Sequence, residues 1–424
     1  MLEISKLKSD IEAVKQSLIR RSFPNPELVD QVLELDESRK SQQKESDDLL
    51  AERNKASKEI GQLFKTGKAQ EANALKERVA AIKMELERKQ EGLKLTEKAL
   101  FDTLIQLPNL PHPDVPPGNT DEDNIVFQAW EQDFPNLPEG AKPHWELAKD
   151  FNLIDFDLGA KITGAGFPLY KGKGARLQRA LISFFLDEAD KAGYLEVLPP
   201  YLVNAQSAFA TGQLPDKEGQ MYYVTEDDLY LIPTAEVPVT NIYRDVIVQE
   251  SELPIKLTGY TPCFRREAGS YGAHVRGLNR VHQFDKVEIV QITHPDKSYD
   301  TLKDMLNHVE GLLNKLGLPF RILTLCGGDL GFASALTYDF EVFSAAQERW
   351  LEVSSVSNFE TFQSNRLKVR FKNDKKKTVL AHTLNGSALA LARIMACVLE
   401  NNQDENGIRI PEVLRPYTGF DYIR

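Results

Sequence analysis

The chain has 424 residues, 42% of them hydrophobic, so it can bury a sizeable core, and two or three domains are expected. Its formal net charge of -11 argues against a protein that coats nucleic acid non-specifically, because such binding needs dense lysine and arginine, but it leaves a local nucleic-acid surface open. The three cysteines, Cys263, Cys326 and Cys397, form no Cys-x-x-Cys pair or Cys/His cluster, so neither a disulfide framework nor a structural zinc site is indicated.

The beginning of the chain, MLEISKLKSD, lacks the apolar core of a signal peptide. No apolar run along the sequence is long enough to span a bilayer. We therefore expect a soluble, cytoplasmic protein that has no membrane partner.

Residues 27–107 have the pattern of two long helices joined by a short turn. They contain no proline, and their apolar residues alternate at spacings of four and three, which is a heptad seam with a weakly polar middle. The seam positions are Leu28, Val32, Leu35, Arg39, Gln42, Ser46, Leu49, Arg53, Ala56, Ile60 and Leu63 and then, beyond a turn at Gly67, Leu75, Val79, Ile82, Leu86, Lys89, Leu93, Thr96, Leu100, Thr103 and Leu107. The pattern predicts an antiparallel coiled-coil arm on the order of 50 Å long, at 1.5 Å per residue.

The composition changes after this arm. Residues 108–124 are rich in proline, glycine and acids and read as a linker, which divides the chain into an N-terminal domain at 1–107 and a second domain at 125–424. Residues 174–193 predict an amphipathic helix that ends at Gly193, and 194–203 an extended segment. Strand pairs are predicted at 256–267 with 279–292 and at 336–345 with 349–358, and residues 378–403 predict a strand, a turn and a buried helix. Consecutive strand pairs with few βαβ units favour the α+β class, with an antiparallel sheet flanked by helices, over a Rossmann fold.

In the stretch 264-FRREAGSYGAHVRGLNRVHQFDKVE-288, one surface of a strand pair could carry an arginine, two carboxylates and an aromatic ring. Side chains two apart on a strand share a face, so Arg265 and Glu267 would point the same way, as would Phe284 and Glu288. Arginine suits a phosphate or carboxylate, and phenylalanine can stack on a base. This face would suit a nucleotide and a small polar acid. The alternative is a solvated hairpin with cross-strand ion pairs.

Two further groups of residues could bind the same kind of ligand. Arg393 is a lone charge in the apolar stretch 388–399, so it needs an acidic partner or an anionic ligand. Glu352 and a nearby serine could hold a hard cation such as Mg²⁺; on a regular strand Ser354 shares the face of Glu352 and Ser355 takes the other. Most such pairs on strands bind nothing. No Walker loop or GxGxxG fingerprint is present, so an ATP site would have to be built from arginine and Mg²⁺ on a sheet.

These residues resemble the signature motifs of a known family. FRREAGSYG…RGLNRVHQFDKVE is similar to the second motif of class II aminoacyl-tRNA synthetases, TLNGSALALAR to their third, and the helix and extended segment up to Pro200 to their first, dimer-forming motif. Together with PTAEVP, TPCFR, TYDFEVF and PEVLRPY, and with the arm, they resemble the bacterial-type seryl-tRNA synthetases over the full length. The resemblance implies a homodimeric ligase that joins L-serine to ATP as seryl-adenylate and passes serine to the 3′ end of tRNA(Ser). Whether tRNA(Sec) is also charged stays open.

The resemblance also implies the roles of individual residues. The catalytic residues would be Arg265, Glu352 and Arg393. The ligands of Mg²⁺ would be Glu352 and Ser355. ATP would be bound by Arg265, Arg266, Glu267, Arg280, Val281, Phe284, Glu352, Val353, Ser354, Ser355 and Arg393. Serine would be bound by Thr234, Ala235, Glu236, Arg265, Glu288, Asn385 and Ser387. No structural zinc is expected.

Two positions depart from the family pattern. Leu351 stands where many bacterial relatives have an arginine near the ATP phosphates, and His274 stands where an acid is frequent.

In this family the arm reaches the long variable arm of a tRNA. The arm carries many lysines and arginines, but its acids are at least as numerous, and a solvated coiled coil explains these charges equally well.

Three alternative functions are considered. A paralogue that loads a carrier protein would usually lack the arm. A relative specific for threonine, proline or alanine is a second alternative, although the threonine enzymes would need zinc ligands. A scaffold that has lost activity should show substitutions at Arg265, Glu288, Glu352 or Arg393, and all four residues are present.

Overall fold

The computed structural model describes residues 1–216, 218–267 and 275–424, and His274 lies outside the described residues. The chain forms two compact units. The first comprises Met1–Ile19 and Phe23–Pro108, and the second comprises Arg20–Ser22 and Asn109–Arg424. Among the described residues, we find no helix with the length and apolar character needed to cross a membrane.

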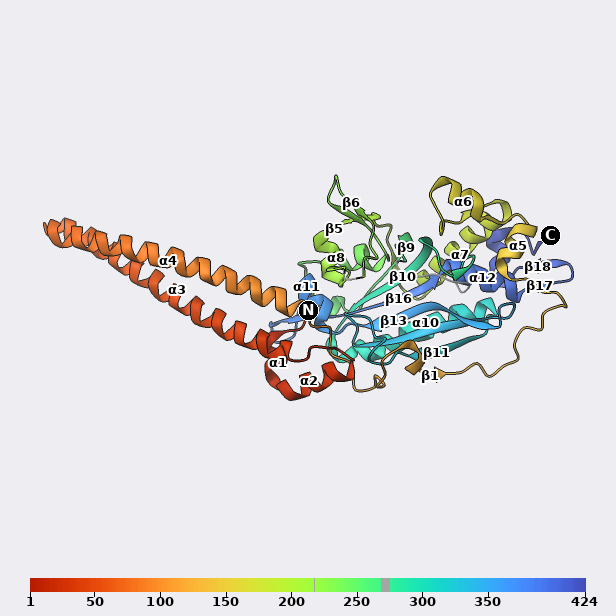
Figure 1. Cartoon of the computed structure of the whole chain (residues 1–424), viewed down its shortest axis with the longest axis horizontal. Helices are drawn as coiled ribbons and strands as arrows, with labels where there is room; N and C mark the ends of the chain where they lie inside the picture. Colours follow the sequence, from red (N-terminus) through yellow and green to blue (C-terminus); the bar gives the residue numbers. More distant parts are fainter. Residues whose placement is uncertain (217, 268–274) are drawn as a thin grey trace. The chain divides into compact units, whose positions relative to one another are not determined.

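The first unit contains the predicted helical hairpin. Its helices are α1 (Ile4–Ser9), α2 (Ile11–Arg20), α3 (Leu28–Lys65) and α4 (Ala69–Leu104). Figure 1 shows α3 and α4 side by side along their length. Gly67, with a φ of 76°, lies in the turn between them, where a left-handed backbone favours glycine. The prediction of an antiparallel coiled-coil arm is confirmed.

The predicted heptad seam agrees with the burial of the two long helices. Every seam position is buried or half-buried, and the polar middle is satisfied by a hydrogen bond from Thr96 Oγ1 to Gln42 Oε1 of 3.1 Å. Asp36 was not expected inside: it is buried and forms ion pairs with Lys8, Arg39 and Lys40. These cations compensate for the loss of solvation of its carboxylate, and they hold its pKa below the usual range.

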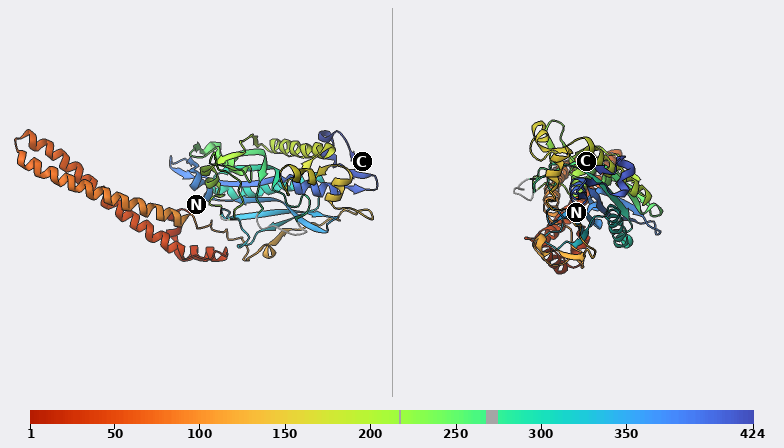
Figure 2. Two further views of the ribbon diagram at one scale, coloured as in Figure 1. Left: turned by 45° about the horizontal axis from the view of Figure 1, so that its top comes forward. Right: turned by 90° about the vertical axis from the view of Figure 1, so that its right-hand side faces the viewer.

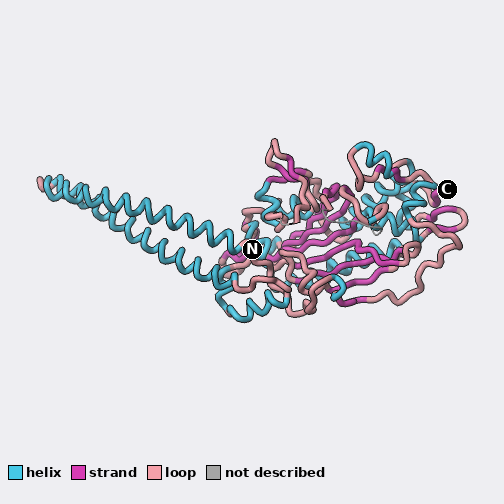
Figure 3. The backbone as a smooth tube through the Cα atoms, in the orientation of Figure 1, coloured by secondary structure: helices cyan, strands magenta, loops and turns pink. Residues whose placement is uncertain are grey.

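The second unit is built on an antiparallel sheet, as predicted. Figure 3 shows its strands running side by side in magenta. Within the described residues the sheet has eight strands in the spatial order β1 (Ile125–Gln128), β11 (Phe320–Thr324), β12 (Leu336–Ser344), β13 (Arg349–Asn358), β16 (His382–Ala390), β10 (Gln283–Thr293), β9 (Ile255–Phe264) and β4 (Leu195–Glu196). Among the described strands of this sheet, only the short β4 pairs in parallel, with β9.

One face of this sheet is covered by helices and carries the main apolar core. Val287, Ile289, Phe340 and Val356 point into this core, which also includes residues of α7, α10 and α12. Figure 2 shows α7 in yellow-green along the strands in its left-hand view. The helices of the unit are α5 (His144–Asp150), α6 (Phe156–Ile162), α7 (Gly172–Lys191), α8 (Ala205–Thr211), α9 (Glu236–Asn241), α10 (Ser298–Leu316), α11 (Thr361–Leu367), α12 (Leu391–Asn401) and α13 (Arg415–Thr418).

Short strands form smaller sheets around the large one. Their members are β15 (Thr378–Leu380), β14 (Arg370–Lys372) and β8 (Ile247–Gln249); β17 (Gln403–Asp404), β18 (Gly407–Arg409) and β19 (Tyr422–Ile423); β2 (Ile154–Asp155) and β3 (Leu169–Tyr170); and β5 (Leu202–Asn204), β7 (Leu229–Leu231) and β6 (Tyr223–Val224). The turn predicted within residues 378–403 is wrong, because Asn385–Ser387 lie inside β16 and α12 follows that strand directly. Two neighbouring strands pair with β16 and hold this segment extended.

Candidate active site

A cavity of about 710 Å³ opens on the face of the sheet opposite the main core. Side chains alternate between the faces of a strand, so Phe284, Lys286 and Glu288 of β10 face the cavity while Val287 and Ile289 face the core. The predicted site residues that line the cavity are Thr234, Glu236, Arg265, Glu267, Arg280, Val281, Phe284, Glu288, Glu352, Val353, Ser354, Ser355, Asn385, Ser387 and Arg393.

Two predicted site residues are not among the lining residues. Ala235 is buried and packs in an apolar cluster with Val239 of α9. Arg266 lies over the ring of Tyr222, with its guanidinium carbon 6.0 Å from the ring centroid. Each of these two positions stands between residues that do line the cavity, Ala235 between Thr234 and Glu236 and Arg266 between Arg265 and Glu267.

The arginine predicted to contact the nucleotide stands over an aromatic ring. The guanidinium carbon of Arg265 is 5.3 Å from the ring centroid of Phe284, and Arg265 Nε donates to the carbonyl of Pro233 over 3.3 Å. The strand prediction for 265–267 is wrong, however: β9 ends at Phe264, and Glu267 has a φ of 48°. Glu267 forms an ion pair with Arg280 instead of sharing a strand face with Arg265.

Four residues beyond Phe284 on β10, polar groups converge on the buried carboxylate of Glu288. Its Oε2 is 2.8 Å from Lys286 Nζ and accepts a hydrogen bond from Thr234 Oγ1 of 3.2 Å. Its Oε1 accepts from Asn385 Nδ2 over 2.9 Å. Burial raises the pKa of Glu288, and Lys286 partly offsets this by favouring the charged form.

Glu236 is a second buried carboxyl in this region. Burial, reinforced by repulsion from Glu288, raises the pKa of Glu236 to about 7. Its Oε1 accepts a hydrogen bond of 2.6 Å from Gln363 Nε2. Two buried carboxyls with raised pKa values beside one cavity are typical of a functional site.

An irregularity in β13 decides which residues face the cavity near Glu352. The register with β12 shifts between Phe340 and Glu341, so that Val353 is one extra residue on β13. On a regular strand Glu352 and Ser355 would point to opposite faces. With this β-bulge they share a face, and Asp339 of β12, which pairs with Ser355, joins them.

The three oxygen-bearing side chains at this bulge suit a hard cation. Asp339 is half-buried, and its Oδ1 is shielded from solvent and has no hydrogen-bond partner. Burial and repulsion from Glu352 raise the pKa of Asp339 well above its usual range, while a hydrogen bond with Ser355 lowers it. Carboxylate and hydroxyl oxygens are the ligands that Mg²⁺ prefers, so these residues fit the ion that ATP carries. Among the described residues, no group of three or more His, Cys, Asp or Glu side chains could hold a metal ion on its own.

Arg393 at the start of α12 reaches the same place. Its Nη1 donates to the carbonyl of Glu352 over 2.7 Å and lies 3.6 Å from Glu352 Oε2, and its Nε donates to the carbonyl of Asn279 over 2.9 Å. The expected acidic partner is therefore present, and the guanidinium still lines the cavity. Leu351, which departs from the family pattern, is buried in the apolar core and does not line the cavity.

Four residues near the predicted ones were not anticipated: Lys286, Asp339, Asn279 and Gln363. The alternation along 284–288 was a usable signal for Lys286, since it shares a face with Phe284 and Glu288. Asp339 is brought in by the pairing of β12 with β13, and Gln363 comes from α11, far along the chain. No signal in the sequence places these two beside the cavity.

Comparison with known proteins identifies the class of this site. The family model described as the tRNA synthetase class II core domain (G, H, P, S and T) matches residues 222–402, which contain the lining residues on β10, β13 and β16. An antiparallel sheet with this cavity on its open face is thus the catalytic domain of a class II aminoacyl-tRNA synthetase.

The particular family follows from the whole chain. The model of the seryl-tRNA synthetase N-terminal domain matches residues 1–111. The chain is 50% identical to a serine–tRNA ligase of Salinibacter ruber, over 99% of this chain and 98% of the relative, and 47% identical to one of Chlorobaculum parvum over the full length of both. The crystal structure of seryl-tRNA synthetase from Pyrococcus horikoshii complexed with ATP has a TM-score of 0.92 at 34% identity and covers 100% of this chain and 99% of its own. The chain belongs to the seryl-tRNA synthetase family, whose members are serine–tRNA ligases.

Proposed function

We propose that this cavity joins L-serine to ATP and then transfers serine to the 3′ end of tRNA(Ser). In the first step a carboxylate oxygen of serine forms a bond to the α-phosphorus, and the bond to the bridging oxygen breaks, releasing diphosphate. In the second step a ribose hydroxyl of the tRNA takes the seryl group and AMP leaves. The observation that carries the proposal is one cavity lined both by an arginine–phenylalanine pair and by the Glu288 cluster.

The ATP half of the cavity would be formed by Arg265, Phe284 and Arg393. Phe284 offers a flat face for the adenine, and the planar guanidinium groups fit phosphate oxygens through paired hydrogen bonds. Arg265 would contact both the α-phosphate and the serine carboxylate and stabilise the charge that develops between them. Arg280, which neighbours Glu267, would meet the outer phosphates.

Glu352, Ser355 and Asp339 would hold Mg²⁺ that arrives with ATP. The ion, when bound, neutralises phosphate charge. The chain supplies two carboxylates and a hydroxyl on one face of the β12–β13 hairpin. The unpartnered Oδ1 of Asp339 supports this assignment.

The serine half would be formed by Glu288, Glu236, Thr234 and Asn385. The carboxyls suit the ammonium group of the amino acid, and the polar side chains, with Ser387, suit its hydroxyl. Alanine would leave buried polar groups unpaired, so it would be rejected strongly. No side chain needs to act as a general base, because the serine carboxylate is already ionised, and positioning with electrostatic stabilisation suffices.

The proposal extends to partners. An apolar segment at β4 supports a homodimer: Leu195 is 64% exposed and Leu198 77% exposed. Sedimentation equilibrium of the protein and of a Leu198→Glu variant tests this, and a monomeric unsubstituted protein would contradict it.

We place the reaction in the cytoplasm and assign the helical arm to the tRNA. An aminoacylation assay with tRNA(Sec) decides whether this tRNA is also charged.

The test of the catalytic proposal is ATP–diphosphate exchange by the purified chain with Mg²⁺. Serine, threonine, alanine, glycine and proline are offered singly. Exchange with serine alone is expected. Exchange with another amino acid would overturn the assignment of Glu288 and Thr234, and no exchange with any of them would overturn the proposed reaction.

A further inference from the structure

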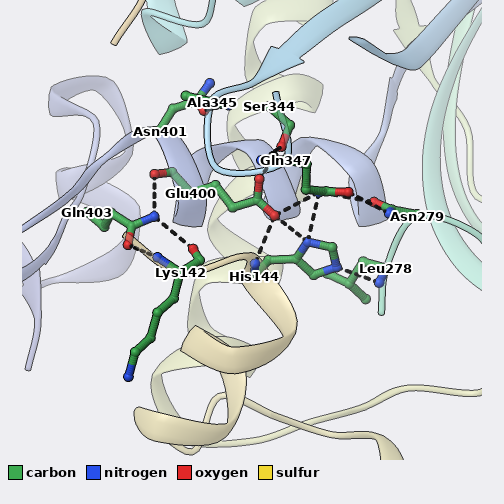
Figure 4. A network of polar contacts seen from close by, with 10 residues as sticks. All are labelled: Lys142, His144, Leu278, Asn279, Ser344, Ala345, Gln347, Glu400, Asn401 and Gln403. Carbon is green, nitrogen blue, oxygen red and sulfur yellow. Dashed lines mark hydrogen bonds and ion pairs between the residues drawn. The ribbon is translucent and has the colours of Figure 1, made fainter. Parts of the chain in front are cut away.

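A buried polar network lies beside the cavity. Figure 4 shows its centre, His144 of α5 and Glu400 of α12, both with fully buried side chains. His144 Nδ1 is 2.6 Å from Glu400 Oε1. The remaining groups that contact Glu400 are the backbone N–H of His144 at 2.8 Å, Gln347 Nε2 at 2.8 Å and the hydroxyl of Ser344.

The protonation of the imidazole follows from its second partner. The backbone N–H of Leu278 donates to His144 Nε2 over 2.8 Å, and a backbone N–H can only donate, so Nε2 carries the lone pair. The ring proton is therefore on Nδ1 and is donated to Glu400. Glu400 thus fixes the orientation of the ring, and the ring in turn fixes the peptide of Leu278.

Burying the Glu400 carboxylate in this network would cost free energy if its only role were to stabilise the fold. The four groups that donate to Glu400 are neutral, and burying a carboxylate without a cation is generally less favourable than packing apolar side chains in the same space. Gly277 shows how closely the chain approaches the ring. It has a φ of 68°, and a Cβ at this position would lie 2.3 Å from His144 Nε2.

The network leads directly to residues of the ATP half. Leu278 and Asn279 both line the cavity. The carbonyl of Asn279 accepts the hydrogen bond from Arg393 Nε, and Asn279 Nδ2 donates to Gln347 Oε1 over 2.8 Å. Gln347 therefore connects Glu400 to Asn279 a second time. Arg280 is the next residue along the chain.

We propose that His144 and Glu400 are positioning residues for ATP, an inference that rests on the proposed function of the cavity. They hold the peptides of Leu278 and Asn279, and these peptides set the positions of Arg393 and Arg280. Neither residue lines the cavity, so neither contacts substrate. The network acts on the nucleotide half and leaves the serine half, on β10 and β16, unaffected.

Two substitutions of His144 test its hydrogen bonds to Glu400 and to Leu278 one at a time. In His144→Asn the amide nitrogen can replace Nδ1 and donate to Glu400, but the side chain is too short to accept from Leu278. In His144→Gln the amide oxygen can replace Nε2 and accept from Leu278, but the donor to Glu400 is lost. A matched control is Gln291→Leu, which removes a buried hydrogen bond of 2.8 Å to Tyr194 on the core side of β10.

The measurements are the Kd for ATP by calorimetry with Mg²⁺, KM for ATP and for serine in diphosphate exchange, and the melting temperature. We expect His144→Asn to raise the Kd and KM for ATP about tenfold, the scale of one lost buried hydrogen bond, with KM for serine within about twofold. His144→Gln should restore most of the ATP affinity. Gln291→Leu should lower the melting temperature without changing ATP affinity.

Equal losses for ATP and serine in His144→Asn, or the same loss in Gln291→Leu, would overturn the proposal, since either would indicate a general effect on folding. If His144→Asn does not fold, Gln347→Ala serves instead: a loss of ATP affinity alone supports the proposal, and an unchanged affinity overturns it. The calorimetric Kd does not need catalysis. If the unsubstituted chain fails to exchange diphosphate with serine, the proposed reaction fails, and the ATP Kd still decides the role of His144.

Discussion

Asn385 Nδ2 donates a hydrogen bond of 2.9 Å to Glu288 Oε1 and so connects β16 to β10 across the floor of the cavity. The other oxygen of Glu288 is contacted by Lys286 and Thr234. The carboxylate is thus held from three sides in one orientation before any ligand enters. Such preorganisation lowers the entropy cost of binding a small amino acid.

Thr234→Val should weaken serine binding specifically. The substitution keeps the shape of the side chain but removes the hydroxyl that donates to Glu288. We expect KM for serine to rise about tenfold in diphosphate exchange, with KM for ATP unchanged, because one buried hydrogen bond is lost in the serine half alone. Thr258→Val is the control, since it removes a buried hydroxyl that donates to the backbone carbonyl of Glu288 outside the cavity. A rise in both constants would contradict the division into two halves.

Glu352→Gln should increase the requirement for Mg²⁺. The amide keeps an oxygen near Ser355 but loses the charge that attracts the ion. The Mg²⁺ concentration for half-maximal diphosphate exchange should rise about tenfold, a change of ~1.4 kcal/mol in ion binding. Glu348→Gln, at the exposed turn between β12 and β13, should leave it unchanged. An identical Mg²⁺ dependence of the two variants would rule out Glu352 as a ligand.

Glu236 should make the stability of the chain depend on pH. Its pKa is about 7 in the folded protein against a usual value of 4.5, so between these values the folded state binds a proton that the unfolded state has released. The free energy of unfolding must then fall as pH rises from about 4.5 to about 7, by about 3 kcal/mol for this group.

Glu236→Gln cannot ionise, so this contribution should vanish. Urea denaturation at pH 5 and pH 8 should show that the unsubstituted chain loses about 2.5 kcal/mol more stability than the variant over this interval. Glu412→Gln, an exposed position, is the control and should behave like the unsubstituted chain. A parallel decline in Glu236→Gln would show that other groups cause the pH dependence.

Shortening the arm should impair the transfer of serine to tRNA and leave the activation of serine by ATP intact. Replacing residues 50–84 by a short Gly–Ser turn removes the outer parts of α3 and α4 and leaves the seam around Gln42 and Thr96 intact. Serine-dependent diphosphate exchange should stay within about twofold, while charging of tRNA(Ser) should fall about 100-fold, or ~2.7 kcal/mol. Loss of exchange as well would mean that the arm contributes to the catalytic domain itself, and unchanged charging would remove the arm from tRNA binding.

The hairpin and the sheet could be predicted because their signals are local. Heptad spacing depends only on residues within a few turns, and it placed every seam position of α3 and α4 on the buried or half-buried side. The strands around Phe264 and Gln283 were likewise visible from alternation and turn residues. The resemblance to the synthetase motifs supplied most residues of the cavity.

The remainder depends on contacts between distant parts of the chain. Ser355, and not Ser354, lies opposite Asp339 and shares the face of Glu352 only because Val353 is an extra residue in β13, and a bulge has no reliable sequence signal. His144 and Glu400 are 256 positions apart, and neither stands in a pattern that would pair them. Glu267 was misplaced because β9 stops at Phe264, where the chain leaves the ladder.

The bulge at Val353 places one residue on β13 that has no counterpart on β12. Removing this residue would leave Glu352 and Ser355 two positions apart on a regular strand, so both would still face the cavity beside Asp339. The strand therefore reaches the same arrangement of ion ligands with two residues or with one residue between Glu352 and Ser355. The shorter strand would lose only Val353, which itself lines the cavity.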